Sequence, residues 1–482
     1  MGELHDLTAL EQGAAVARGE VSPRELADHY LDRAQRHSDG VGAYVTLTPE
    51  VAREQADRLA AELRDTGDGA AGARSPLHGV PVPVKDLNLT AGIRTTFGSA
   101  AFRDFVPDVD DSVVVRLRDA GTVLLGKTSA SELGLPCYTE PDLAPPSRSP
   151  WAPDRMAGGS SGGAAAAVAA GLAPVAHGND GGGSVRIPAS CCGLVGLKPA
   201  RGRVSGGPVR GDVSGLPCEG VLARTVRDAA ALLDVMAGPT PGDPHWAPPL
   251  PSGESFLGHA GREPGRLRVA RFVTPVIGHA AVHDECLTAY DRTTRLLTEL
   301  GHQVEEIAAP FTAEVVPLFE TVWSVLPTLA PVPQGREELL RPLTRWLRER
   351  GRSVAASDFA LALATLQVLA RRAVRAMVEY DAVLSPTLAQ PPLPVGALRD
   401  DDDPAGDFAA QEAFTPWTAL WNLTGQPAVS LPLHVTDAGL PVGVMLAGRP
   451  AGEAGLLSLA AQMESAAGTV WTTGGGARPA CW

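Results

Sequence analysis

The sequence predicts an α/β fold, with a central mixed β-sheet inside one large domain and helices on both faces of the sheet. Apolar segments with the character of buried strands alternate with segments of helical period from end to end of the 482 residues. Hydrophobic residues make up 44% of the chain and charged residues 20%, which permits a large core and excludes wholesale disorder. No internal repeat or clean linker divides the chain. We therefore expect a single domain over residues 1–482.

The expected helices begin and end at residues with a clear stereochemical role. Ser22 to Glu25 form a capping box with proline at the first helical position, so a helix begins at Pro23. Gly121 ends one helix and Thr225 caps another. The alanine-rich segment 164–170 is expected to form a helix with almost no side-chain bulk, so this helix must pack closely against its neighbours. After the first, the expected helices are 111–120, 164–170, 226–237, 284–300 and 453–466.

The expected strands are short apolar runs bounded by turn residues. They are 80–84, 123–125, 267–273, 304–307, 382–384, 429–433 and 442–446. The first contains two prolines and leads, as an irregular strand, into Lys85 and Asp86. Residues 400–407 are expected to form a solvated acidic loop.

Composition excludes several classes of function. The chain carries 41 Lys+Arg and 55 Asp+Glu residues, a formal charge of −14, whereas phosphate binding requires a basic face. The most apolar stretch, 162–176, is too short to span a bilayer, and no signal-peptide pattern is visible. The six cysteines are scattered and the histidines do not cluster with them, which favours reduced thiols and gives a zinc site no support. We expect a cytoplasmic protein with no nucleic-acid partner, membrane segment, metal or organic cofactor.

One formal motif is rejected on physical grounds. Residues 121–128 match GxxxxGK[ST], the phosphate-binding loop. In that loop a strand precedes the first glycine and the middle residues form an open turn. Here a helix precedes Gly121, and 123–125 have the character of the strand itself. We therefore expect a buried strand and no nucleotide site.

The stretch 157–203 carries the most unusual chemistry. Gly181 to Gly183 lead into Ser184, and consecutive N–H groups in a glycine turn form an anion nest suited to an oxyanion hole. Taken alone, Ser184 would be interpreted as a turn residue, because a serine nucleophile needs a base. A Ser-His-Asp triad is defined by geometry, and His177 and Asp180 lie within seven residues of Ser184. Arg186 also breaks the GxSxG elbow, so His177 is expected to be a core or hydrogen-bonding residue.

This stretch resembles the signature of the amidase signature family of serine hydrolases. Further resemblances to the family lie at 78–86, 120–128, 422–432 and 439–444, so that nearly the whole chain is covered, with a signature core at about 75–205. Within the family, several segments are similar to bacterial 6-aminohexanoate cyclic dimer hydrolases, which open small cyclic or linear amides. These segments are 139–141, 150–151, 174–180 and 184–190.

The resemblance implies a Ser-Ser-Lys triad. Ser184 would be the nucleophile, Lys85 the base, and Ser160 the bridge between them, held by a cis peptide bond after Gly159. A buried lysine can lose its charge and act as a base. Seen alone, Lys85 would be interpreted as a surface lysine or as one ion-paired near Asp86.

The resemblance also implies the groups around the triad. The N–H groups of Gly181, Gly182, Gly183 and Ser184 would form the oxyanion hole. The supporting residues would be Ser161, Asp180 and Arg186. Most of the family has Thr where Asn179 and Gly181 stand, and Ser is common in place of Ala164. These departures remove no triad residue, but they leave substrate choice open.

Candidates for the pocket wall come from loops that face the site in this family. They are Cys137, Tyr138, Trp417 and Trp421, with core packing as the equal alternative for both tryptophans. The segment 312–415 is least like the family's common pattern and is expected to shape the pocket.

The function expected from this resemblance is hydrolysis of a C–N bond in a small linear or cyclic amide through an acyl-enzyme. Three alternatives stay open: amide synthesis by aminolysis, an amidotransferase subunit that passes ammonia to a partner, and a binding protein that has lost catalysis. The partner is a small-molecule amide, and a homodimer is a family-level expectation.

Overall fold

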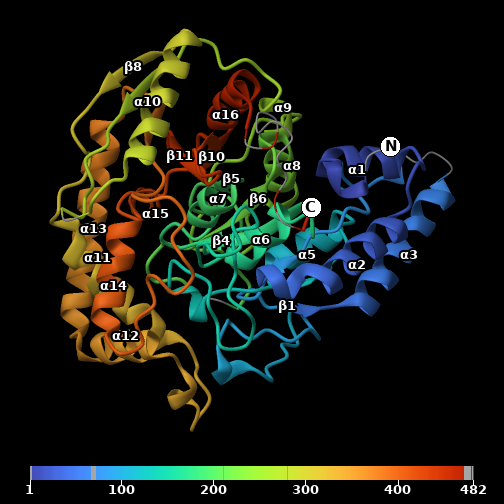
Figure 1. Cartoon of the computed structure of the whole chain (residues 1–482), viewed down its shortest axis with the longest axis horizontal. Coiled ribbons are helices and arrows are strands. Elements are labelled where there is room, and N and C mark those ends of the chain that lie inside the picture. The colour runs from blue at the N-terminus through green and yellow to red at the C-terminus, as the bar shows by residue number, and fades with distance from the viewer. Residues whose placement is uncertain are drawn as a thin grey trace.

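A mixed β-sheet of eight strands crosses the computed structural model, which describes residues 3–66, 72–209, 211–278, 280–469, 471, 479 and 481–482 (Figure 1). Its strands are β4 (Val175–Asp180), β5 (Val195–Lys198), β6 (Cys218–Ala223), β7 (Arg268–Arg271), β8 (Gln303–Glu306), β9 (Ala382–Pro386), β10 (Ala428–Val435) and β11 (Pro441–Gly448). The order is β4-β6-β5-β10-β11-β9-β7-β8. Neighbours are antiparallel except β9-β7 and β7-β8, which are parallel.

A smaller sheet stands beside the first and carries Lys85. Its strands are β1 (Tyr44–Leu47), β2 (Val84–Lys85) and β3 (Gly126–Thr128), in the order β1-β3-β2. The backbone N–H of His177 in β4 donates to the carbonyl of Pro83 at 3.2 Å. This bond joins the two sheets at the point where β2 begins.

Helices surround both sheets. They are α1 (Ala9–Ala17), α2 (Pro23–Val41), α3 (Pro49–Thr66), α5 (Ser112–Asp119), α6 (Gly162–Ala169), α7 (Arg186–Cys192), α8 (Val226–Met236), α9 (Phe256–His259), α10 (Asp284–Glu299), α11 (Val315–Val325), α12 (Pro342–Ser353), α13 (Ala356–Ala376), α14 (Pro404–Phe414), α15 (Leu420–Thr424) and α16 (Glu453–Ala467). Helices α11 to α14 gather on one flank of the molecule, and α1 to α3 lie on the opposite flank (Figure 1).

Successive residues along the strands divide between different hydrophobic clusters. Val175 packs with α8, α10 and α16, whereas the next residue, Ala176, packs with α2, α6 and α7. Val383 packs with α11 and α13, and Leu384 lies in the same cluster as Val175. Because successive side chains of a strand point to opposite faces, the large sheet is covered on both faces. This confirms the predicted α/β architecture.

Three sequence-based expectations were wrong in detail. Of the strand expected at 80–84, only Val84 lies in a regular strand. The strand expected at 123–125 lies at Gly126–Thr128, and Val123 makes only an isolated bridge to Pro81. The expected solvated loop at 400–407 ends as a helix, because Pro404 begins α14 and Asp407 is buried within it.

Among the described residues no single helix is long and apolar enough to cross a membrane. The pair α12 and α13 passes that test only when taken together, across a bend of 102°.

Candidate active site

Lys85 ends β2 and is completely buried. Its Nζ atom lies 2.8 Å from Ser160 Oγ, 2.7 Å from Asn179 Oδ1 and 3.2 Å from the Asn179 carbonyl oxygen. The two oxygens of Asn179 only accept hydrogen bonds, whereas the Ser160 hydroxyl both donates and accepts. A neutral amine has two N–H donors and one lone pair. These contacts fit a charged ammonium, which donates to all three oxygens, and equally a neutral amine, which donates to Asn179 and accepts from Ser160.

Backbone contacts hold the two glycine-flanked serines beside the Ser184 loop. The peptide bond between Gly159 and Ser160 is cis, as the resemblance implies. The N–H of Ser161 donates to the Ser184 carbonyl at 3.1 Å, and the Ser161 hydroxyl donates to the Asn179 carbonyl at 3.2 Å. The N-terminus of α6 and the loop after β4 are thereby tied together. The structure thus gathers Lys85, Ser160 and the loop that carries Ser184 in one place.

The Asp180 carboxylate organises the loop that leads to Ser184. It accepts from the N–H of Gly183 at 2.8 Å, from the N–H of Val185 at 3.1 Å, and from two nitrogens of Arg186 at 2.8 and 2.9 Å. Burial raises the pKa of Asp180, but the Arg186 guanidinium more than offsets burial and holds this pKa well below its usual range. Asp180 is therefore a buried carboxylate anion that shapes the turn.

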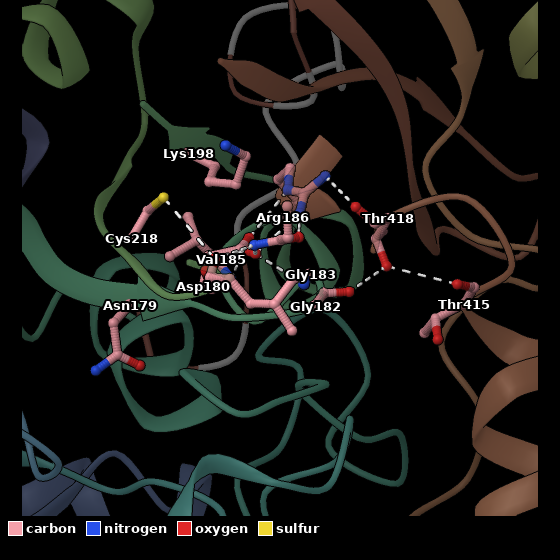
Figure 2. A network of polar contacts seen from close by, with 12 residues as sticks. Asn179, Asp180, Gly182, Gly183, Val185, Arg186, Lys198, Cys218, Thr415 and Thr418 are labelled. Atoms are coloured by element: carbon pink, nitrogen blue, oxygen red, sulfur yellow. Dashed lines mark hydrogen bonds and ion pairs between the residues drawn. The ribbon is translucent and has the colours of Figure 1, made fainter. Parts of the chain in front are cut away.

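Arg186 connects this loop to the far end of the chain. Its guanidinium donates to the Thr418 carbonyl at 2.7 Å (Figure 2). It also donates to Asn422 Oδ1 at 2.7 Å. The Thr418 hydroxyl in turn donates to the Gly182 carbonyl at 2.6 Å. Thr418 and Asn422 lie more than 230 residues away in sequence, and neither was predicted as a partner of the loop. The only signal was the family-like segment that begins at Asn422.

The expected oxyanion hole needs one correction. The N–H of Gly183 is engaged by the Asp180 carboxylate, so it does not face the site as a free donor. For the N–H groups of Gly181, Gly182 and Ser184, no acceptor is found among the described residues. Those three N–H groups remain as candidate donors to an anion.

A chain of buried polar groups continues from Lys85 away from the serines. The Asn179 amide donates to Asn88 Oδ1 at 3.2 Å, and the Asn88 amide donates to Glu219 Oε1 at 3.1 Å. Glu219 Oε2 lies 2.8 Å from His177 Nε2. His177 is thus a buried hydrogen-bonding residue, as expected. Its Nδ1 accepts from the backbone N–H of Lys85 at 3.4 Å, which closes the chain.

Ser184 opens onto a cavity of about 100 Å³. Ser184 is only 7% exposed and lines the cavity together with Gly182 and Cys137. The apolar wall consists of Leu135, Ile187, Val276, Ile277, Val315, Val316, Phe319, Trp323, Phe408, Pro416, Ala419, Leu420 and Leu423. Four of these residues lie on α11 and Phe408 lies on α14, and both helices fall within the segment expected to shape the pocket. An amide with an apolar body fits such a wall.

The four predicted wall residues differ in position. Cys137 lines the cavity, and burial raises the pKa of its thiol well above the usual value, so the thiol stays protonated and is a poor competing nucleophile. The Tyr138 hydroxyl donates to Asp407 Oδ2 at 2.6 Å, which ties α14 to the loop before the signature. Trp417 and Trp421 are fully buried in the core and are not among the cavity-lining side chains. Core packing accounts for both tryptophans.

The rejected nucleotide motif and the candidate metal ligands lie outside this cavity. Lys127 is fully buried on β3, and its Nζ donates to the Asn88 carbonyl at 2.6 Å and to Thr95 Oγ1 at 2.8 Å. In the described part of the chain, Glu3, His5 and His29 bring potential ligand atoms within 4.8 Å of one another. This group lies at the N-terminal helices, and none of its members lines the cavity at Ser184.

The chain is similar to amidases over almost its whole length. A family model described as Amidase matches residues 25–457. The 6-aminohexanoate-cyclic-dimer hydrolase of Paenarthrobacter ureafaciens is 35% identical, with 95% of this chain and 94% of that protein covered. A solved structure of 6-aminohexanoate cyclic dimer hydrolase complexed with substrate has a TM-score of 0.87 at 32% identity and covers 99% of both chains. A bacterial aryl acylamidase of the amidase signature family has a TM-score of 0.84 at 25% identity and covers 96% of both chains. Because the matched residues include Lys85, both serine loops and the sheet between them, this chain belongs to the amidase family and is a hydrolase of amide bonds.

Proposed function

We propose that this protein hydrolyses small linear or cyclic amides through an acyl-enzyme on Ser184, with Ser160 and Lys85 as its proton relay. The observation that carries the proposal is the 2.8 Å contact between Lys85 Nζ and Ser160 Oγ in a fully buried setting. A serine hydroxyl is a weak nucleophile until a base accepts its proton, and a neutral lysine amine is such a base. The similarity to 6-aminohexanoate cyclic dimer hydrolases supports small amides as the substrate class.

The proposed reaction has two halves. In the first, Ser160 passes its proton to Lys85 and accepts the proton of Ser184, whose oxygen attacks the amide carbonyl carbon. The resulting oxyanion is stabilised by N–H groups of Gly181, Gly182 and Ser184. When the C–N bond breaks, Ser160 donates a proton to the leaving amine and regains one from Lys85. In the second half, water attacks the acyl-enzyme by the same relay and releases the acid.

The test is intact mass after treatment with a fluorophosphonate probe. Wild type should gain one adduct, and Ser184→Ala should gain none. Ser190→Ala is the matched control, because Ser190 is also buried but its hydroxyl accepts from the backbone N–H of Gly443 and does not line the cavity, so the variant should keep the adduct. Turnover of 6-aminohexanoate cyclic dimer and of acyl anilides is then followed with and without an added amine acceptor. An adduct that survives Ser184→Ala would overturn the assignment, and an amide product in place of acid would indicate a transferase.

A further inference from the structure

Glu412 is an ionisable group on the cavity wall that the proposed chemistry does not use. It lies on α14 and lines the same cavity as Ser184 and Gly182. Its carboxyl is partly buried, and among the described residues no hydrogen-bond or ion-pair partner of that carboxyl is found. A partly buried carboxyl without a partner is costly, and the cost is relieved when a ligand supplies a donor.

The position of Glu412 follows from its neighbours on α14. The preceding residue, Gln411, accepts from the N–H of Cys137 at 2.8 Å and donates to Asp407 Oδ1 at 2.6 Å. Asp407 also accepts from the Tyr138 hydroxyl. These bonds fix the helix against the loop before the signature, so Glu412 is held in the wall by a rigid element.

The charges around Glu412 leave its carboxyl open to a cation from the cavity. The negative charge of Glu320 on α11 raises the pKa of Glu412, and the positive charge of Arg350 on α12 lowers this pKa. The Arg350 guanidinium already donates to the Glu320 carboxylate and forms an ion pair with it. Burial, followed by the charge of Glu320, raises the pKa of Glu412 to about 7. On its own helix, Asp407 is engaged by Tyr138 and Gln411.

We propose that the Glu412 carboxylate binds a distal ammonium group of the substrate, so that the enzyme is selective for amides whose acyl chain ends in a primary amine. The apolar wall between Ser184 and Glu412 would hold the methylene chain, and Glu412 would supply the charge-assisted hydrogen bond at its end. This inference rests on the proposed function for the identity of the reacting serine.

The kinetic test compares two p-nitroanilides of equal shape, one with a 6-aminohexanoyl group and one with a heptanoyl group. At pH 8, kcat/KM of wild type should favour the amino substrate by about 10- to 100-fold, the size expected of a charge-assisted hydrogen bond. Glu412→Gln should abolish the preference and leave heptanoyl turnover within about threefold of wild type. Glu314→Gln, which removes a carboxylate from an exposed position just before α11, is the matched control and should keep the preference. A preference that persists in Glu412→Gln, or its absence from wild type, would overturn the proposal.

Calorimetry separates this proposal from the proposed function, because it needs no turnover. Hexylamine should bind wild type more tightly than hexan-1-ol does, and Glu412→Gln should equalise the two affinities. Hexylamine binding should weaken from pH 8.5 to pH 5.5, since Glu412 becomes protonated while the amine stays charged. Failure of anilide hydrolysis together with this binding pattern would contradict the proposed chemistry alone. Equal hexylamine affinity in both proteins would overturn the role of Glu412, whatever the outcome of the hydrolysis assay.

Discussion

Asn179 Oδ1 lies 2.7 Å from Lys85 Nζ, inside a pocket that is otherwise closed around the amine. The other end of the Asn179 amide donates to Asn88, which is itself bound to Glu219. The hydrogen bonds to Asn88 and Glu219 therefore fix the orientation of the Asn179 amide. Because Asn179 offers Lys85 only acceptors, it holds the amine at a fixed position beside Ser160.

Replacing Asn179 tests this positioning role. Asn179→Leu should lower kcat by about 10- to 100-fold, because the amine loses its side-chain acceptor and can rotate away from Ser160. Asn179→Asp should stabilise the protonated amine through its carboxylate, and so move the acidic limb of the pH–rate profile to higher pH. Both are measured as kcat across pH with a chromogenic amide. Unchanged profiles in folded variants would show that Asn179 has only a structural role.

Gly183 is expected to tolerate no side chain. Its φ is +134°, and an added Cβ would lie 2.5 Å from Thr418 Oγ1 and 2.7 Å from Ile187 Cδ1. Thr418 holds the Gly182 carbonyl, so any displacement disturbs the loop before Ser184. Gly183→Ala should lower the free energy of unfolding by about 1–3 kcal/mol from overpacking alone and should reduce kcat.

Gly181→Ala is the control for that change. A Cβ at Gly181 meets only the Trp323 ring, at 3.7 and 3.8 Å, which is ordinary contact. Because the added methyl group meets no close contact, the variant should keep its melting temperature. It also keeps the backbone N–H of residue 181. Equal damage from both substitutions in thermal unfolding and turnover would contradict the steric explanation.

The pair of Arg186 and Asp180 should be essential for stability. Both side chains are fully buried, and their charged atoms approach to 2.8 Å. Arg186→Met leaves the Asp180 carboxylate buried without its cation and should cost about 3–5 kcal/mol of unfolding free energy. The measurement is denaturant unfolding at pH 7. Arg18→Met breaks an exposed pair with Glu20 and should leave the midpoint unchanged.

Glu464 should make stability depend on pH near neutrality. Burial raises the pKa of Glu464 to about 7, although its carboxylate accepts from the N–H of Val226 at 3.1 and 3.2 Å. Because the pKa of Glu464 is higher in the folded protein than its usual value of 4.5, protonation of Glu464 stabilises the folded state. This stabilisation is fully present below pH 4.5. That contribution is lost as pH rises through about 7 and amounts to at most about 3 kcal/mol.

The melting temperature of wild type should accordingly fall between pH 5 and pH 8. Glu464→Gln should remove this part of the fall. The control is Glu299→Gln, at an exposed position on α10, which should keep the wild-type profile. An identical pH dependence in wild type and Glu464→Gln would exclude Glu464 as its source.

Features that depend on local interactions were predicted from the sequence. Ser22 accepts from the N–H of Glu25 at the start of α2, and Thr225 accepts from the N–H of Asp228 at the start of α8, as their spacing indicates. The alternation of strands and helices predicted the covered sheet, because period and capping act over a few residues. The roles assigned to the triad came from resemblance, and they stay predictions until the probe experiment is done.

Only the tertiary structure decided which groups meet across long stretches of chain. The sequence around Asp407 predicts an acidic loop. In the structure Asp407 is buried, and its carboxylate accepts a hydrogen bond from the Tyr138 hydroxyl, 269 residues away. The sequence predicts that the N–H of Gly183 faces an oxyanion. In the structure this N–H donates to the Asp180 carboxylate, which is held in place by Arg186. Trp417 carries no local sign that distinguishes a pocket wall from a core. The sequence by itself determined the fold class, the capped helices and the glycine-rich loop before Ser184, since those depend on neighbours along the chain. The partners of each buried polar group were decided by how the elements pack, since burial forces such groups to find partners wherever the fold supplies them.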